Sequence, residues 1–220
     1  MSPPAEGALS VFGQLWNPAK AYSALLSRSS AIWSVISSCL VILAISTIPV
    51  LAAPVRLDAV LSMPGGSSLP VAALPLISLA ERLMLAGLGG AAVWAVAKAA
   101  GRRTGLVLCL QAALLAQPVY VAASVGSGLV LDAFGAPPGA SPGPAALLGT
   151  PAAGAPILAA LAWLLLSMFD LPSILCLSFW GLGIASLERR PASSGMATTF
   201  SLYVLAILLL ALPVLSGPPG

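Results

Sequence analysis

The feature that most constrains this chain is a set of long stretches without any charged residue. Residues 31–53 form the clearest one, with 23 consecutive uncharged and mostly apolar residues before Pro54. A helix needs about 20 apolar residues to cross the hydrocarbon core of a bilayer, which is roughly 30 Å thick. Only 7% of the 220 residues are charged, whereas soluble domains carry about 25%. We therefore predict an all-α integral membrane protein.

The same criterion predicts five membrane-spanning helices. A segment over 1–30 precedes them, a tail over 216–220 follows them, and a proline-rich loop over 132–156 separates the third span from the fourth. The first span is too long for the apolar part of a signal peptide, so we expect it to be retained. The expected spans cover about residues 31–53, 76–97, 106–130, 171–187 and 194–215.

The apolar run over 157–187 is too long for one crossing, and it contains Phe169-Asp170-Leu171-Pro172. Asp is a favoured N-cap, and Pro fits the first turn of a helix, where its missing N–H is not needed. We therefore expect a short helix over 157–168 and a span that begins at Leu171, with Asp170 as its cap. A broken helix also exposes N–H groups that bind an anion or a partner carbonyl.

Basic residues are concentrated on one side of the predicted spans. Seven of the nine Lys and Arg residues fall there, including Lys20 and Arg28 before the first span, while the opposite side has only Arg56. The positive-inside rule places the basic side in the cytoplasm. We therefore predict a multi-pass protein of the cytoplasmic membrane, with its N-terminus inside and its C-terminus outside. The cations between spans, here called the basic edge, are Lys98, Arg102, Arg103, Arg189 and Arg190.

The N-terminal segment is expected to contain a helix that lies on the membrane surface. Asn17-Pro18 is typical of a helix start, with an N-cap followed by Pro at the first helical position. The helix over 18–27 would place Tyr22 and Leu25 on one apolar side. An interfacial helix and a poorly ordered leader are the two interpretations.

Polar residues inside the spans are the candidates for a functional site, because ionisable groups there are costly and usually functional. Adjacent helix positions do not share a face, so we do not expect Glu81 and Arg82 to neutralise each other. They partner other polar residues between helices, or they rest at the interface with their charges in the headgroup region. Gln117 is expected to bridge helices rather than to contact a substrate. The candidate polar intramembrane site comprises Glu81, Arg82, Gln111, Gln117 and Asp170.

The residue inventory argues against catalysis. The chain has no His, which removes His-containing triads and imidazole metal sites. Cys39, Cys109 and Cys176 each lie within an apolar run, where cysteine usually behaves as a small hydrophobic residue. We predict a protein that is not an enzyme and that needs no cofactor or metal. The basic residues are scattered at span ends, so no nucleic-acid partner is expected.

Three stretches of the chain resemble the Yip1 family of five-span membrane proteins, in its short bacterial form. They are LWNPAKAYSALLSRSSAIWSVI, GRRTGLVLCLQAALLAQPVYV and LLLSMFDLPSILCLSFWGLGIASLERR. The third matches an Asp-led entry into span four through Asp170, Ser173 and Gly183, with Leu175 where the family often has Trp and Pro172 as a further departure. The resemblance, over about residues 10–215, implies five helices and a cytoplasmic N-terminus. Eukaryotic relatives work with lipidated small GTPases through a long cytosolic region, for which the roughly thirty residues here are too few.

Two functions compete. The first is a non-enzymatic membrane scaffold or accessory subunit, which contacts membrane lipids and holds another membrane protein or a second copy of itself. The second is a small carrier or lipid-handling protein that uses the polar residues around the broken helix. A five-helix bundle has little room for an aqueous path, which favours the scaffold. A row of small residues predicts close packing of the second span: Ala86, Gly87, Gly89, Gly90 and Ala91.

Overall fold

In the computed structural model, the described parts of the chain are residue 22 and residues 28–52, 73–136, 143–147 and 156–215. Within them every regular element is helical, which confirms the all-α prediction. The elements are α3 (Arg28–Ala52), α5 (Leu74–Ala99), α6 (Leu106–Ala133), the short 3-10 helix η2 (Pro144–Leu147), α7 (Ile157–Met168), α8 (Leu171–Glu188) and α9 (Ala192–Leu215).

Five of these helices, α3, α5, α6, α8 and α9, are long and apolar enough to cross a membrane, as predicted. The 12 residues of α7 span only about 18 Å, which is too short for a crossing. The third span runs past its expected end, because α6 continues to Ala133 into the segment expected to be loop. Which side of the membrane each terminus faces stays a prediction, and the tail at 216–220 lies outside the described residues.

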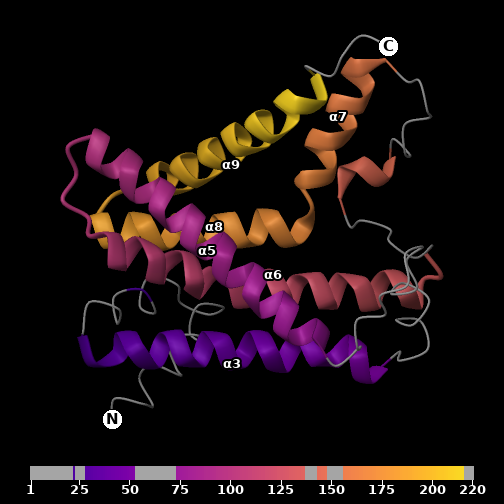
Figure 1. Ribbon diagram of the computed structural model, residues 1–220, viewed down its shortest axis with the longest axis horizontal. Helices are drawn as coiled ribbons and strands as arrows, with labels where there is room; N and C mark the ends of the chain where they lie inside the picture. Colours follow the sequence, from indigo (N-terminus) through magenta and orange to yellow (C-terminus); the bar gives the residue numbers. More distant parts are fainter. Residues whose placement is uncertain (1–21, 23–27, 53–72, 137–142, 148–155, 216–220) are drawn as a thin grey trace.

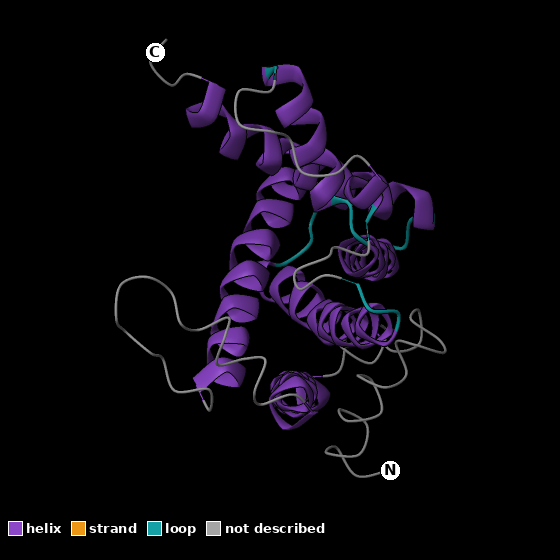
Figure 2. Ribbon diagram, turned by 90° about the vertical axis from the view of Figure 1, so that its right-hand side faces the viewer, coloured by secondary structure: helices purple, strands orange, loops and turns teal. Residues whose placement is uncertain are grey.

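Three helices form a row in the order α3, α6, α8, with α6 in the middle (Figures 1 and 2). α5 crosses this row obliquely on one side, and α9 packs on α8 (Figure 1). Every residue over 112–119 of α6 is buried. A helix that is covered on all sides over two turns must lie inside the bundle, so α6 forms the core of the protein.

Glycines allow the helices around this core to approach one another closely. A Cβ atom at Gly90 of α5 would lie 2.8 Å from the Cα atom of Leu110 in α6. A Cβ atom at Gly181 of α8 would lie 2.6 Å from the Cα atom of Met196 in α9. At the same crossing Thr199 donates a hydrogen bond of 3.0 Å to the carbonyl oxygen of Leu177. Small residues and hydroxyls therefore hold these helices together, as is usual within membranes.

The row of small residues expected to pack closely on α5 splits between two faces. Ala86 and Gly90 are buried, and Gly89 lies against the indole of Trp180 in α8. Gly87, in contrast, has open space where its side chain would be, and Ala91 is exposed. The close-packing prediction is therefore right for one face of the helix and wrong for Gly87 and Ala91.

Tyr22 connects the N-terminal segment to the core. The residue is helical and its side chain is fully buried, with the ring against Gly183 of α8. Its hydroxyl donates a hydrogen bond of 3.4 Å to the carbonyl oxygen of Ala112 in α6. Burial raises the pKa of the phenol well above its usual value, so the group stays neutral. Tyr22 thus packs within the protein instead of on an apolar face toward lipid; the rest of the expected interfacial helix lies outside the described residues.

The glycine crossings predict opposite effects for two similar substitutions. Gly181→Ala places a methyl group against the backbone of α9 and should lower the free energy of unfolding by about 1–3 kcal/mol. The methyl group added by Gly87→Ala would have no atom within 4 Å. This variant should leave the free energy of unfolding unchanged or raise it by up to about 1 kcal/mol, because Ala favours the helix. Thermal unfolding of both variants in detergent tests this; equal effects would contradict the assigned crossing.

Candidate functional site

Arg82 occupies a site between α5 and α6. Its guanidinium carbon lies 4.0 Å from the centre of the Tyr120 ring, and one of its nitrogens lies 2.6 Å from a carboxylate oxygen of Glu81. The Arg82 side chain is only 11% exposed, whereas that of Glu81 is 51% exposed. The prediction that these neighbours do not neutralise each other is wrong. Their Cβ atoms point about 100° apart, but the long arginine side chain brings its charge back to the carboxylate.

A cavity of about 330 Å³ surrounds this ion pair and is formed by α3, α5 and α6. One wall carries hydroxyl groups, and Ser46 of α3 donates a hydrogen bond of 3.2 Å to Ser78 of α5. The polar members of the lining are Ser46, Ser78, Glu81, Arg82, Tyr120 and Ser124. We call this cavity the Arg82 pocket. Its mixed polar and apolar wall suits a small polar molecule or the polar part of a lipid.

The helix lengths place the Arg82 pocket toward the ends of its helices that lie away from the basic edge. Tyr120 lies 14 residues after the first residue of α6, or about 21 Å along the axis. Arg82 lies 17 residues before the end of α5, or about 25 Å. Both distances are shorter than the hydrocarbon thickness of roughly 30 Å, and Arg82 turns inward to Tyr120. Whether the ion pair lies between the helices within the apolar layer or at the interface stays a prediction.

The structure brings some of the other predicted polar residues to this region. Asp170, together with Glu81 and Arg82, lies within electrostatic range of Tyr120. Gln117 is buried, and its amide nitrogen donates a hydrogen bond of 3.2 Å to the carbonyl oxygen of Ala113. The same nitrogen lies 3.9 Å from the sulfur of Cys176 in α8, so Gln117 bridges helices as expected.

Gln111 does not join this group. It precedes Gln117 by six residues, or about 9 Å along α6, and its side chain is half-buried.

Asp170 has the expected structural role at the start of α8. Its carboxylate accepts a hydrogen bond of 2.8 Å from the backbone N–H of Ser173 and thus caps the helix. The preceding residue, Phe169, has its ring stacked at 6.5 Å on Phe200 and edge-on at 5.8 Å to Tyr203, both in α9. The break between α7 and α8 is therefore held in place by a cap and by aromatic contacts.

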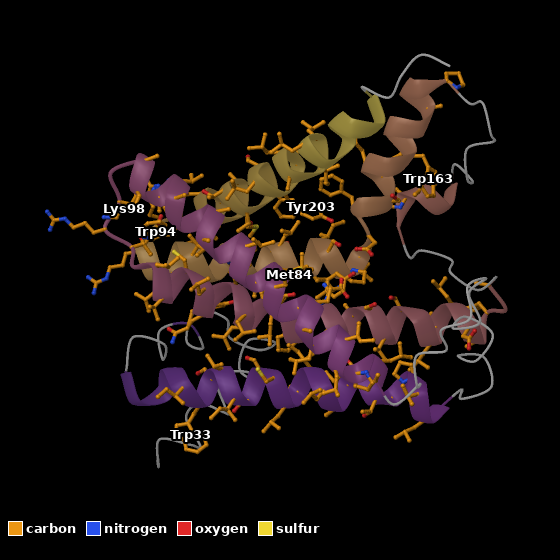
Figure 3. The ribbon with its side chains drawn as sticks, viewed as in Figure 1. Trp33, Met84, Trp94, Lys98, Trp163 and Tyr203 are labelled. Carbon is orange, nitrogen blue, oxygen red and sulfur yellow. The ribbon has the colours of Figure 1, made fainter. Side chains whose placement is uncertain are left out.

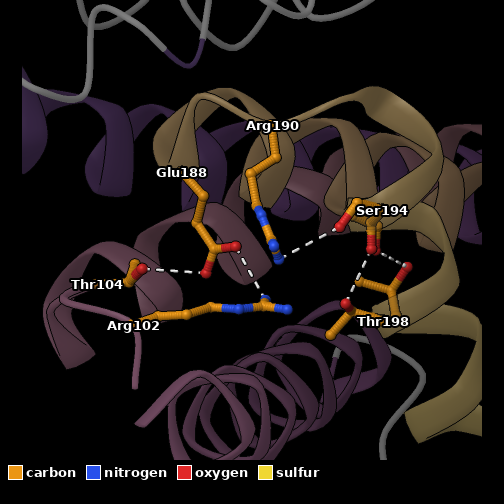
Figure 4. A network of polar contacts seen from close by, with 8 residues as sticks. Arg102, Thr104, Glu188, Arg190, Ser194 and Thr198 are labelled. Carbon is orange, nitrogen blue, oxygen red and sulfur yellow. Dashed lines mark hydrogen bonds and ion pairs between the residues drawn. The ribbon is translucent and has the colours of Figure 1, made fainter. Parts of the chain in front are cut away.

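A second polar group lies at the opposite end of α8 and ties two connections together (Figure 4). Glu188 accepts a hydrogen bond of 2.9 Å from Arg102 and one of 3.1 Å from Thr104. Its side chain is 6% exposed. Arg190 donates a hydrogen bond of 3.5 Å to Ser194 at the start of α9. Glu188 thus fixes the α5–α6 connection against the end of α8.

These residues border a cavity of about 440 Å³, here called the basic pocket. The basic edge thus divides into cations that line the pocket and cations that do not. Lys98 and Arg189 belong to the second group, and both are exposed. The lining comprises Arg102, Arg103, Thr104, Gly105, Leu108, Leu187, Glu188 and Arg190.

Two important residues were missed by the sequence reasoning. Tyr120 was not singled out, and no local pattern shows that it lies beneath Arg82, which is 38 residues away. Glu188 carried a usable signal, because it is the acidic residue that directly precedes Arg189 and Arg190 at the end of a span. A carboxylate among cations at a span end is well placed to pair with one of them.

The described residues contain no group of three His, Cys, Asp or Glu side chains that could hold a metal ion. Comparisons with protein families, curated proteins and solved structures found no match to this chain. The resemblance to the Yip1 family therefore stays a prediction.

The cap at Asp170 leads to a direct test. Asp170→Ala removes the acceptor for the Ser173 N–H and should lower the free energy of unfolding by about 1 kcal/mol, whereas Asp170→Ser keeps an acceptor and most of the stability. Thermal unfolding of the two variants in detergent measures the difference. If Ser is as destabilising as Ala, the charge of Asp170 matters more than its cap.

Proposed function

We propose that the protein is a non-enzymatic membrane scaffold or accessory subunit, of the Yip1-like type, that holds another membrane protein against the outward face of α5. We further propose that it works in the cytoplasmic membrane, with the basic edge in the cytoplasm. The partner is an apolar membrane helix that offers a hydrogen-bond donor or a cation to Glu81.

The observation that carries this proposal is the position of Glu81. Arg82 turns toward Tyr120, whereas the Cβ of Glu81 points about 100° away from that of Arg82; Glu81 lies at the rim of the Arg82 pocket, on the same face of α5 as Met84 and Leu88. Those two side chains are 58% and 65% exposed, and Figure 3 marks Met84. A half-exposed carboxylate inside a span is costly when it faces lipid. A partner that covers this face and donates a hydrogen bond to Glu81 removes this free-energy cost. Lipid tails offer no donor.

Small residues continue the same face toward the basic edge. Ala91 and Ala95 are exposed and follow Leu88 at helical spacing, while Gly87 at the margin has open space beside it. Lipid tails are as apolar as large side chains, so small residues on a lipid-facing surface gain nothing from the lipid. They do let a second helix approach closely. The face therefore combines a polar contact point with a smooth packing surface.

The rest of the bundle is consistent with a static support. The backbones meet closely at Gly90 and Gly181, and at these two crossing points the helices leave no space for a solute path. Glu188 fixes the α5–α6 connection to the end of α8 at one end of the bundle. These contacts favour a body of fixed shape that presents α5 to a partner.

Site-specific cross-linking tests the proposal. A photoreactive residue at Leu88 should give one discrete cross-linked species in native membranes, whereas the same residue at Leu208, an exposed position on α9, should not. Ala91→Leu combined with Ala95→Leu should weaken the cross-link by at least about tenfold, because bulk prevents close approach. Glu81→Gln keeps an oxygen acceptor and should retain the partner.

The matched control is Ala206→Leu, which makes one such Ala→Leu change at an exposed position of α9 and should leave the Leu88 cross-link unchanged. A cross-linked species of twice the chain mass would make the partner a second copy. A stable monomer without any cross-link from Leu88 would contradict the scaffold.

A second candidate function, a small carrier or lipid-handling protein, is favoured by the Arg82 pocket. Glu81→Ala should then abolish the binding of a lipid or solute that stays with the purified protein, while Gln111→Ala, outside the pocket, should not. Mass spectrometry of the purified variants measures the bound molecule, and gel filtration shows that they remain folded. Unchanged occupancy in Glu81→Ala would exclude this function.

A further inference from the structure

The basic pocket contains more positive charge than its one carboxylate balances. Glu188 uses its two oxygens to accept from Arg102 and Thr104. Arg103 and Arg190 line the same cavity and, among the described residues, neither is in an ion pair. Two guanidinium groups therefore face one cavity with free donor capacity. Guanidinium groups bind phosphate oxygens in pairs of parallel hydrogen bonds, so a phosphate would match the chemistry of this cavity.

The start of α6 adds backbone donors to the same cavity. Gly105 is the N-cap of this 28-residue helix, and no side chain caps it. The first N–H groups of a helix lack partners within the helix and favour negative charge nearby. Gly105 and Leu108 both line the pocket, so these donors contribute to a site that the arginines already define.

The cavity has an apolar side as well. Leu108 belongs to the first turn of α6 and Leu187 to the last turn of α8, and both residues line the pocket. Both helices are predicted spans. The pocket therefore lies where two spans meet the membrane boundary. A ligand with a phosphate attached to acyl chains matches both sides of this cavity, whereas a free phosphate matches only the arginines.

We propose that the basic pocket, between the α5–α6 connection and the end of α8, binds the phosphate of an anionic phospholipid through Arg103 and Arg190. Glu188 holds Arg102 in the wall and keeps the shape of the site. Basic pockets between spans on the cytoplasmic side commonly hold anionic headgroups. The site is separate from the Arg82 pocket and from the outward face of α5, so it is independent of the proposed function.

Lipid titration of the full-length protein tests the inference. The purified, delipidated protein is titrated in mild detergent with phosphatidylglycerol and, separately, with phosphatidylcholine, and native mass spectrometry counts the bound molecules. One phosphatidylglycerol should bind in preference to phosphatidylcholine. Arg103→Gln and Arg190→Gln should each weaken this binding by about fivefold, the typical effect of one basic residue at an anionic headgroup. Both side chains are exposed, so the variants should fold, which gel filtration checks.

Arg189→Gln provides the matched control. Arg189 is next to Arg190 and has the same charge, but it does not line the pocket, so its substitution should change binding by less than about twofold. An equal loss in Arg189→Gln would show a diffuse basic surface and overturn the proposal. Equal binding of phosphatidylcholine would also overturn it. Full competition by millimolar inorganic phosphate would overturn the lipid assignment and identify free phosphate as the ligand.

Discussion

Close contact between helix backbones is the constraint on which the rest of the structure depends. Helices in a bilayer gain little by hiding apolar side chains from lipid, because lipid tails are equally apolar. Their association depends on van der Waals contact and on a few hydrogen bonds. In this protein Gly90 permits the contact of α5 with α6, and Gly181 permits that of α8 with α9. These contacts set the position of α5 relative to α6 and of α8 relative to α9, and with them the positions of the polar groups that project from these helices.

The few charged residues lie at the two ends of the bundle. The two ends differ in which sign of charge is enclosed and which is left in excess. Near the Arg82 pocket, one cation is enclosed by an aromatic ring and a neighbouring carboxylate, and the surplus polarity faces outward through Glu81. At the basic edge, one carboxylate is enclosed, and the surplus is positive charge on Arg103 and Arg190. Buried charges are satisfied at both ends. The surplus charged groups, Glu81 at one end and Arg103 and Arg190 at the other, are exposed, where another molecule can reach them.

The sequence was sufficient for features that depend on neighbouring residues. The apolar run over 157–187 and its Asp170-Leu171-Pro172 interruption predicted the start of α8 and both bounds of α7 to the residue. The other spans begin and end within a few residues of their expected limits. Asp170 was identified as a cap because an N-cap needs only the three residues that follow it. The role of Gln117 between helices could be predicted because amide side chains inside spans commonly form hydrogen bonds to a neighbouring helix.

The features that the sequence did not show depend on residues far apart in the chain or on side-chain reach. Tyr22 enters the core because Gly183, about 160 residues later, leaves room for its ring. The stacking of Arg82 on Tyr120 requires the crossing of two helices. The pairing of Arg82 with Glu81 was excluded wrongly, since the rule for adjacent helix positions describes Cβ directions and not the reach of a long guanidinium side chain.

The end of α8 shows why a rigid connection is useful at the basic edge. Arg189 adopts a left-handed conformation, with φ of 52°, in the position where helices usually have glycine. This conformation costs roughly 1 kcal/mol or more for a residue with a side chain. It turns the chain so that the N–H of Arg190 bonds to the carbonyl oxygen of Ala185 at 2.8 Å. The backbone at Arg190 is therefore fixed before any ligand binds, and the contacts of Glu188 with Arg102 and Thr104 fix the backbone on both sides of Arg103. Because the backbone is ordered on folding, binding a headgroup has to order only the two exposed arginine side chains. This smaller entropy cost suits a single headgroup better than cations on a mobile loop would.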